Sequence, residues 1–284
     1  MAEATKRAYR ADVEAFLSWG GVIPSTPTQV ARYLAGLAEN LCPATLQRRA
    51  VAIGKAHVAQ AYTDPTKDEH VRATLRGIRR VHGRPQRQSV ALLKEDLLVV
   101  VDALPDSLIG VRDRALLLVG FAGGFRRSEL VGIDVADLKF VPEGLLVTLR
   151  RSKTDQQGIG RRVGIPYGRT RACPVKALRA WLDRASIATG PVFRPVSKRG
   201  RAGCRPLTAQ SVNLVLRKRV ASVGLSCDGL SAHSLRAGLV TAAAKLGVSS
   251  WKIRQQTGHR SDAMLQRYIR DADIFVENAA GAIL

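Results

Sequence analysis

Apolar positions in the first part of the chain recur at i, i+3 and i+4, which is the period of an amphipathic helix. The first run ends at Gly20-Gly21, a second follows Thr26-Pro27, a third starts at Pro43, and a fourth covers Val71 to Ile78. Thr followed by Pro suits a helix start, because Thr caps the helix and Pro fits its first position. The pattern predicts four helices and no strand in this part.

The rest of the chain mixes two periods. Three short segments have the pattern of strands, with a turn at Pro142-Glu-Gly144 and a polar loop, Ser152 to Gly158, between the last two. The predicted strands are Ile133–Phe140, Gly144–Arg150 and Arg161–Pro166. The predicted helices around them are Lys94–Leu104, Val111–Ala122, Pro174–Ala188, Leu207–Val223, Ala232–Leu246, Ser250–Thr257, Asp262–Arg270 and Asp273–Ala280. The fold class is therefore mainly α, with a mixed α+β second part that holds a small three-stranded antiparallel sheet.

A polar, basic stretch without apolar periodicity, His82 to Ser89, separates the two parts. Such a composition is typical of a linker. We therefore expect a domain over residues 1–84, a linker over 85–90 and a second domain over 91–284. Both parts are basic, with 13 basic and 7 acidic side chains in residues 1–86 and 32 and 16 in residues 87–284.

The net charge of +22 indicates a polyanionic partner, since each phosphate that a basic protein neutralises releases counterions. Nucleic acid is the expected partner; a membrane surface or a ribosome is the alternative. The four cysteines are widely spaced, and no apolar run reaches the length of a membrane helix. We expect a cytoplasmic, nucleoid-associated protein without a membrane partner.

Six side chains that carry chemistry follow one another along the second part. Arg126 comes after a glycine turn, Lys153 lies in the polar loop, and His233 and Arg236 are one helical turn apart. His259 follows Gly258, and Tyr268 comes nine residues later. Each alone has a structural explanation, such as an Arg that caps carbonyls or a His in the core.

Taken in order, these residues resemble the tyrosine recombinase family, also called the lambda-integrase or phage integrase family. Its pattern is Arg, hairpin Lys, His-x-x-Arg, His or Trp, and Tyr, and every position is filled here. The resemblance implies a two-domain form like that of Xer and Cre, in which residues 1–84 are a SAM-like core-binding domain and residues 91–284 are catalytic. It also implies double-stranded DNA as substrate, with a dimer on one site and a tetramer in synapsis.

The chemistry of strand cleavage needs these residue types. Attack on a phosphodiester builds negative charge on the non-bridging oxygens, which the forked guanidiniums of Arg126 and Arg236 would neutralise. Tyr268 would be the nucleophile, Lys153 the proton donor to the leaving oxygen, and His233 the base or orienting group. By the resemblance, His259 would contact the phosphate and Glu129 would support the site. No carboxylate cluster indicates a two-metal site, so neither a metal nor a cofactor is expected.

Two alternative functions stay open. A type IB topoisomerase uses the same kind of site to relax supercoils, and a DNA-binding protein without catalysis would share the fold.

The residues after Arg236, Ala-Gly-Leu-Val, depart from the family's common His-Thr-Phe-Ala. The chain begins almost at the first core-binding helix, so an arm-binding domain is not expected. The apolar tail from Asp273 onward would dock either on a neighbouring subunit or on its own domain.

Overall fold

The computed structural model describes residues 3–84, 89–150, 160–263 and 265. The chain divides into two compact units, Met1–Gln86 and Arg87–Leu284, each of which is described separately. The division falls in the stretch that the sequence predicts to be a linker.

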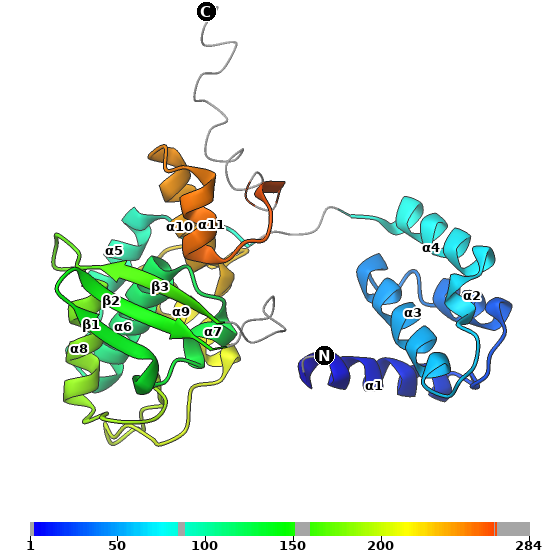
Figure 1. Ribbon diagram of the computed structural model, residues 1–284, viewed down its shortest axis with the longest axis horizontal. Coiled ribbons are helices and arrows are strands. Elements are labelled where there is room, and N and C mark those ends of the chain that lie inside the picture. Colours follow the sequence, from blue (N-terminus) through cyan, green and yellow to red (C-terminus); the bar gives the residue numbers. More distant parts are fainter. Residues whose placement is uncertain (1–2, 85–88, 151–159, 264, 266–284) are drawn as a thin grey trace, which may run out of the picture. The chain divides into compact units, whose positions relative to one another are not determined.

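Within the described residues 3–84, the first unit consists of four α-helices and one short 3-10 helix (Figure 1). The elements are α1 (Glu3–Ser18), α2 (Pro27–Gly36), α3 (Pro43–Val58), η1 (Pro65–Lys67) and α4 (Glu69–His82). The Thr26 hydroxyl accepts the Gln29 amide at 3.2 Å, as expected of the cap that precedes Pro27. The ring of Phe16 packs edge-on against Tyr33, and both are buried in the core of the unit.

The second unit contains a sheet with order β1-β2-β3, in which both pairs are antiparallel. Its strands are β1 (Leu138–Val141), β2 (Gly144–Leu149) and β3 (Arg161–Pro166). Its helical elements are α5 (Lys94–Asp102), α6 (Leu108–Gly123), α7 (Arg127–Val131), η2 (Val135–Asp137), α8 (Pro174–Arg184), α9 (Ala209–Ala221), α10 (His233–Lys245) and α11 (Ser250–Thr257). The mainly helical fold with a small antiparallel sheet confirms the predicted fold class.

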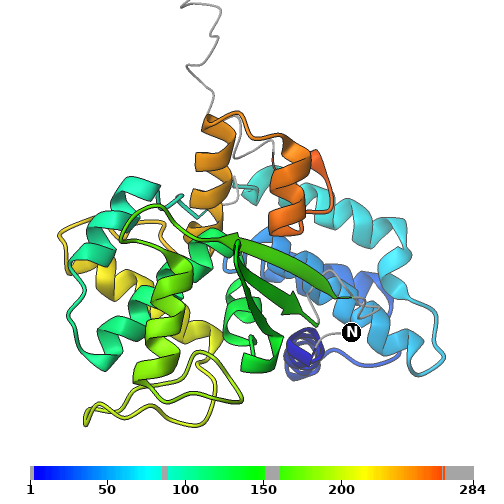
Figure 2. The ribbon, with the colours of Figure 1, turned by 60° about the vertical axis from the view of Figure 1, so that its left-hand side comes forward.

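The register of the sheet decides which side chains of β3 face the core. Leu145 pairs with Ile165 and Val147 with Val163, and all four are buried. Both α6 and α8 contact β3 and each other, and α11 contacts β3 as well. Figures 1 and 2 show α10 and α11 side by side near this strand. Strand β3 therefore contacts both the buried helix α6 and the short helix α11, which carries the second half of the site.

The first strand is shorter than predicted. Ile133–Phe140 was expected to be extended, but η2 occupies its middle and β1 starts at Leu138. The reason is local hydrogen bonding: the Asp134 carboxylate accepts the Ala136 amide at 3.1 Å, and the Asp134 amide donates to Asp137 at 3.0 Å. Short polar side chains of this kind compete with a strand ladder and favour a turn.

The predicted helix Asp262–Arg270 lies mostly, and Asp273–Ala280 wholly, outside the described residues, as does the polar loop between β2 and β3. In the part of the chain that the structure describes, no helix combines the length and apolarity that crossing a bilayer requires.

Candidate active site

The first half of the site is built where α6 ends. Gly124 has a left-handed φ of 57°, which ends α6 and turns the chain into α7. Arg126 is the residue before α7, and the buried Glu129 reaches back to it. The Arg126 amide donates to the Glu129 carboxylate at 2.9 Å, and its guanidinium donates to the other oxygen at 2.6 Å. Glu129 thus fixes both the backbone and the side chain of Arg126.

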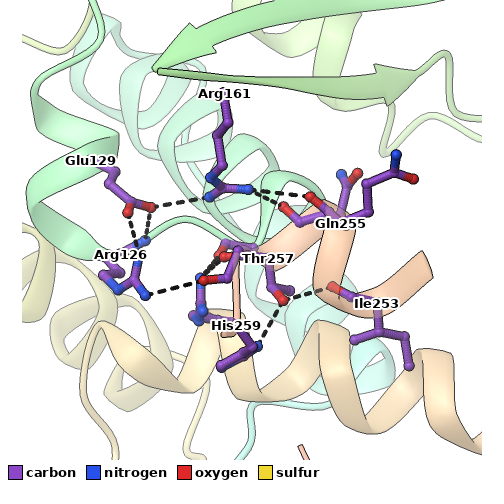
Figure 3. A network of polar contacts seen from close by, with 11 residues as sticks. Arg126, Glu129, Arg161, Ile253, Gln255, Thr257 and His259 are labelled. Carbon is purple, nitrogen blue, oxygen red and sulfur yellow. Dashed lines mark hydrogen bonds and ion pairs between the residues drawn. The ribbon is translucent and has the colours of Figure 1, made fainter. Parts of the chain in front are cut away.

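Arg161, the first residue of β3, enters the same network (Figure 3). Its guanidinium lies 3.4 Å from the Glu129 carboxylate and donates to the Gln256 carbonyl oxygen at 2.7 Å. Its Nε is buried and has no hydrogen-bond partner among the described residues. Burial and the neighbouring charge of Arg126 lower the pKa of Arg161, although Glu129 opposes this shift.

His233 and Arg236 lie on α10, as the sequence predicts. Arg236 is 1% exposed, and its Nη1 donates to the Gly124 carbonyl oxygen at 2.7 Å and to the Thr257 carbonyl oxygen. These bonds join the end of α6 to the end of α11. His233 begins α10 and keeps an exposed surface. Burial of its ring by surrounding atoms, followed by the charges of Arg236 and Arg126, lowers its pKa, which favours the neutral imidazole.

The second half of the site lies at the end of α11. Gly258 has a φ of 70° and turns the chain so that His259 folds back beneath the helix. The Arg126 guanidinium is 3.5 Å from the Gly258 carbonyl oxygen. The His259 ring is buried, and its Nδ1 lies 2.7 Å from the Thr257 hydroxyl. Arg126 and His259, far apart in sequence, therefore meet at one corner of the backbone.

The electrostatics of this corner favour an anion. Burial, followed by the charges of Arg236 and Arg126, lowers the pKa of His259 to about 3. Desolvation and nearby positive charge both disfavour the protonated ring, and here they act in the same direction. Preorganised cations such as these guanidinium groups are suited to stabilising negative charge on a phosphate. Among the described residues, no group of three or more metal-ligating side chains is found.

Two of the predicted site residues, Lys153 and Tyr268, lie outside the described residues. Leu265, three positions before Tyr268, is fully buried in a small cluster with Val240 of α10 and Ile253 of α11. Four of the predicted residues that the structure describes belong to one hydrogen-bond network: Arg126, Glu129, Arg236 and His259. His233 lies on the same helix as Arg236. The roles of all seven stay predictions.

Sequence reasoning missed Arg161 and Thr257. Arg161 alternates with Val163 and Ile165, which places it on the buried face of β3. An arginine on the apolar face of a strand signals a partnered charge, and this signal was available in the sequence. Thr257 gave no comparable signal, because its importance depends on the backbone turn at Gly258.

Comparison with known proteins identifies the class of the protein as a DNA strand-transferring enzyme. The model of the phage integrase family matches residues 91–274. The chain therefore belongs to the phage integrase family, and it is a tyrosine recombinase, as the order of its site residues predicts.

Two relatives support this membership. An integrase/recombinase XerD homolog of Selenomonas ruminantium is 39% identical over 98% of this chain and 84% of its own length. The tyrosine recombinase XerD of Corynebacterium glutamicum is 30% identical over 61% of this chain and 54% of its own length.

Solved structures share the fold. A XerH site-specific recombinase in a post-cleavage complex with difH superimposes with a TM-score of 0.69, at 18% identity, over 96% of this chain and 78% of the other. A lambda integrase bound to DNA gives 0.65, at 18% identity, over 98% and 92%. At this identity the likeness shows the fold alone.

Proposed function

We propose that this enzyme is a site-specific recombinase that cuts and rejoins double-stranded DNA through a covalent 3′-phosphotyrosyl link at Tyr268. The observation that carries the proposal is the meeting of Arg126, Arg236 and His259 at the Gly258 corner. Arg126 immediately precedes α7, Arg236 lies on α10, and His259 follows the Gly258 turn at the end of α11.

In the proposed reaction, the Tyr268 oxygen attacks phosphorus, the bond from phosphorus to the 5′ oxygen breaks, and a 5′-hydroxyl leaves. The guanidinium groups of Arg126 and Arg236 stabilise the negative charge that develops on the non-bridging oxygens. His233, which its surroundings keep neutral, accepts or directs the phenol proton, and Lys153 supplies the proton for the leaving oxygen. A second 5′-hydroxyl reverses the step on another strand, so no nucleotide hydrolysis is required.

The units and partners follow from the same proposal. Residues 1–84 would bind the core site, residues 85–90 would connect, and residues 91–284 would be catalytic. Related structures include a lambda integrase dimer bound to a core site and a lambda integrase tetramer bound to a Holliday junction. We propose the same assemblies here, a dimer on one site and a tetramer in synapsis, in the cytoplasm with the nucleoid.

Trapping on a nicked suicide duplex tests the proposal. Duplexes that the protein binds are selected from a random pool, nicked near the binding site and incubated with the full chain. The wild-type protein and Tyr167→Phe should give a denaturation-resistant adduct, and Tyr268→Phe should give none. An adduct that persists in Tyr268→Phe would refute the nucleophile. Relaxation of supercoiled plasmid without paired sites would instead identify a type IB topoisomerase.

A further inference from the structure

The Thr257 hydroxyl lies between two polar atoms. Its oxygen is 2.6 Å from the Ile253 carbonyl oxygen, one turn back along α11, and 2.7 Å from His259 Nδ1. Thr257 is fully buried, and His259 is 7% exposed. Figure 3 shows the two contacts in sequence, from Ile253 through Thr257 to the imidazole.

The protons in this chain of contacts have one consistent arrangement. A carbonyl oxygen only accepts, so the hydroxyl gives its single proton to Ile253. Toward His259 the Thr257 oxygen is therefore an acceptor, and Nδ1 must carry the proton. A neutral imidazole has one N–H, which leaves Nε2 with a lone pair.

We infer that Thr257 is a positioning residue that holds neutral His259 as the Nδ1–H tautomer, with Nε2 as an acceptor. His259 then donates from Nε2 only after it has gained a second proton from solvent. This inference rests on the proposed function, because it concerns how His259 meets the scissile phosphate. It adds a residue that the motif of the family does not include.

The charges around the ring decide when the second proton binds. Arg236 and His233 face it from α10, Arg126 from the start of α7 and Arg161 from β3, and all four disfavour a cationic ring. The carboxylate of Glu129 forms ion pairs with Arg126 and Arg161 and thereby offsets part of their positive charge. A phosphate placed among these groups would favour protonation of His259 by its own negative charge. The ring would then become a donor when the substrate arrives.

Nitrogen-15 NMR of the full chain reads the tautomer directly, without DNA. The chain has five histidines, and His259→Gln identifies the signal of His259. His57 is an internal reference for the Nδ1–H form, because its Nδ1 contacts the Ile53 carbonyl at 2.8 Å and its Nε2 accepts the Ser25 amide at 2.9 Å. We expect His259 to match His57 in wild type and in Thr257→Ser, and to shift toward Nε2–H in Thr257→Val.

Two readings would overturn the inference: an Nε2–H signal for His259 in wild type, or an Nδ1–H signal that persists in Thr257→Val. The wild-type reading needs no variant, and Thr257→Ala replaces the Val variant should that protein not fold. The spectra stand even if the protein cuts no DNA, so failure of the proposed function remains distinguishable.

Cleavage of the suicide duplex links the tautomer to the reaction. The ratio of the single-turnover rate of Thr257→Val to that of Thr257→Ser cancels the titration of every other group. Above the pKa of His259 in the complex, the locked ring of the Ser variant cannot donate, whereas the ring of the Val variant can. The ratio should therefore rise with pH above the pKa of His259 in the complex. A ratio that does not change with pH would contradict a role for Thr257 in the reaction.

Discussion

Arg161 donates to the main-chain carbonyl oxygen of Gln256 across 2.7 Å. This bond ties the first residue of β3 to the last turn of α11, just before the Gly258 corner. The same guanidinium lies beside the carboxylate that orients Arg126. The sheet edge, α7 and α11 are therefore parts of one polar network, and a change at any of them reaches Arg126.

Arg161→Met should loosen the end of α11 and slow strand cleavage. The variant keeps the length of the side chain but loses the bond to Gln256 and the pairing with Glu129, at a cost of about 1–3 kcal/mol in unfolding free energy. Hydrogen exchange of the α11 amides and chemical denaturation measure the effect. Arg162→Met, the exposed neighbour on the same strand, is the matched control. Equal hydrogen exchange and equal unfolding free energies in the two variants would contradict a role for Arg161 in holding the end of α11.

Arg126→Lys should abolish most cleavage while the fold is retained. An ammonium cannot span the Glu129 carboxylate and a phosphate in the way a forked guanidinium does, so we expect a loss of about 100-fold in single-turnover cleavage. Arg127→Lys changes the exposed neighbour and should cleave like wild type. A comparable loss in both variants would point to a general effect of charge at the start of α7.

Gly258→Ala should cost more than Gly247→Ala, although both glycines have a φ near +70°. The left-handed conformation costs an alanine about 1 kcal/mol at either position. A Cβ at position 258 would lie 2.9 Å from Nε of Arg161, whereas one at position 247 meets nothing within 4 Å. We expect about 1–3 kcal/mol of additional destabilisation at 258 and a drop in cleavage there alone. Paired denaturation curves decide between strain and contact.

His259 should make the protein less stable in mild acid. Its pKa falls from 6.5 to about 3 on folding, so between these values the unfolded chain binds a proton that the native state excludes. Stability therefore rises with pH across this window and is lost as the pH falls. Between pH 7 and pH 5, wild type should lose about 1–2 kcal/mol more than His259→Gln. Denaturation at both pH values measures this, with His70→Gln as control for the loss of an exposed imidazole. Equal losses in wild type and His259→Gln would contradict the shift.

Most of the fold was predictable because it depends on local periodicity. The apolar stripes located α1 to α4, and alternation located β2 and β3 with bounds that differ by no more than one residue. The start of β1 was wrong because the hydrogen bonds of Asp134 favour a turn over continued strand. The short helix α7 also went unpredicted, since five residues between a glycine turn and a loop carry too little periodicity.

The site was predictable as a set of residue types but not as a network. The order of Arg126, His233, Arg236 and His259 identified the family, yet Arg126 and Arg236 bond main-chain oxygens, which a sequence does not reveal. The Gly124 and Thr257 carbonyls that hold Arg236 come from segments more than a hundred residues apart. The turns at Gly124 and Gly258, together with the packing of α10 against α6 and α11, bring them together.

Those two carbonyls have a consequence for tolerance to substitution. Every amino acid carries a carbonyl oxygen, so an exchange of side chains at positions 124 and 257 that preserves the path of the backbone leaves both acceptors of Arg236 in place. An insertion or deletion at either corner would displace one of these carbonyl oxygens from Arg236. A complete mutational scan of this region should therefore find Arg236 irreplaceable, and changes of chain length near its anchor more damaging than most changes of residue identity.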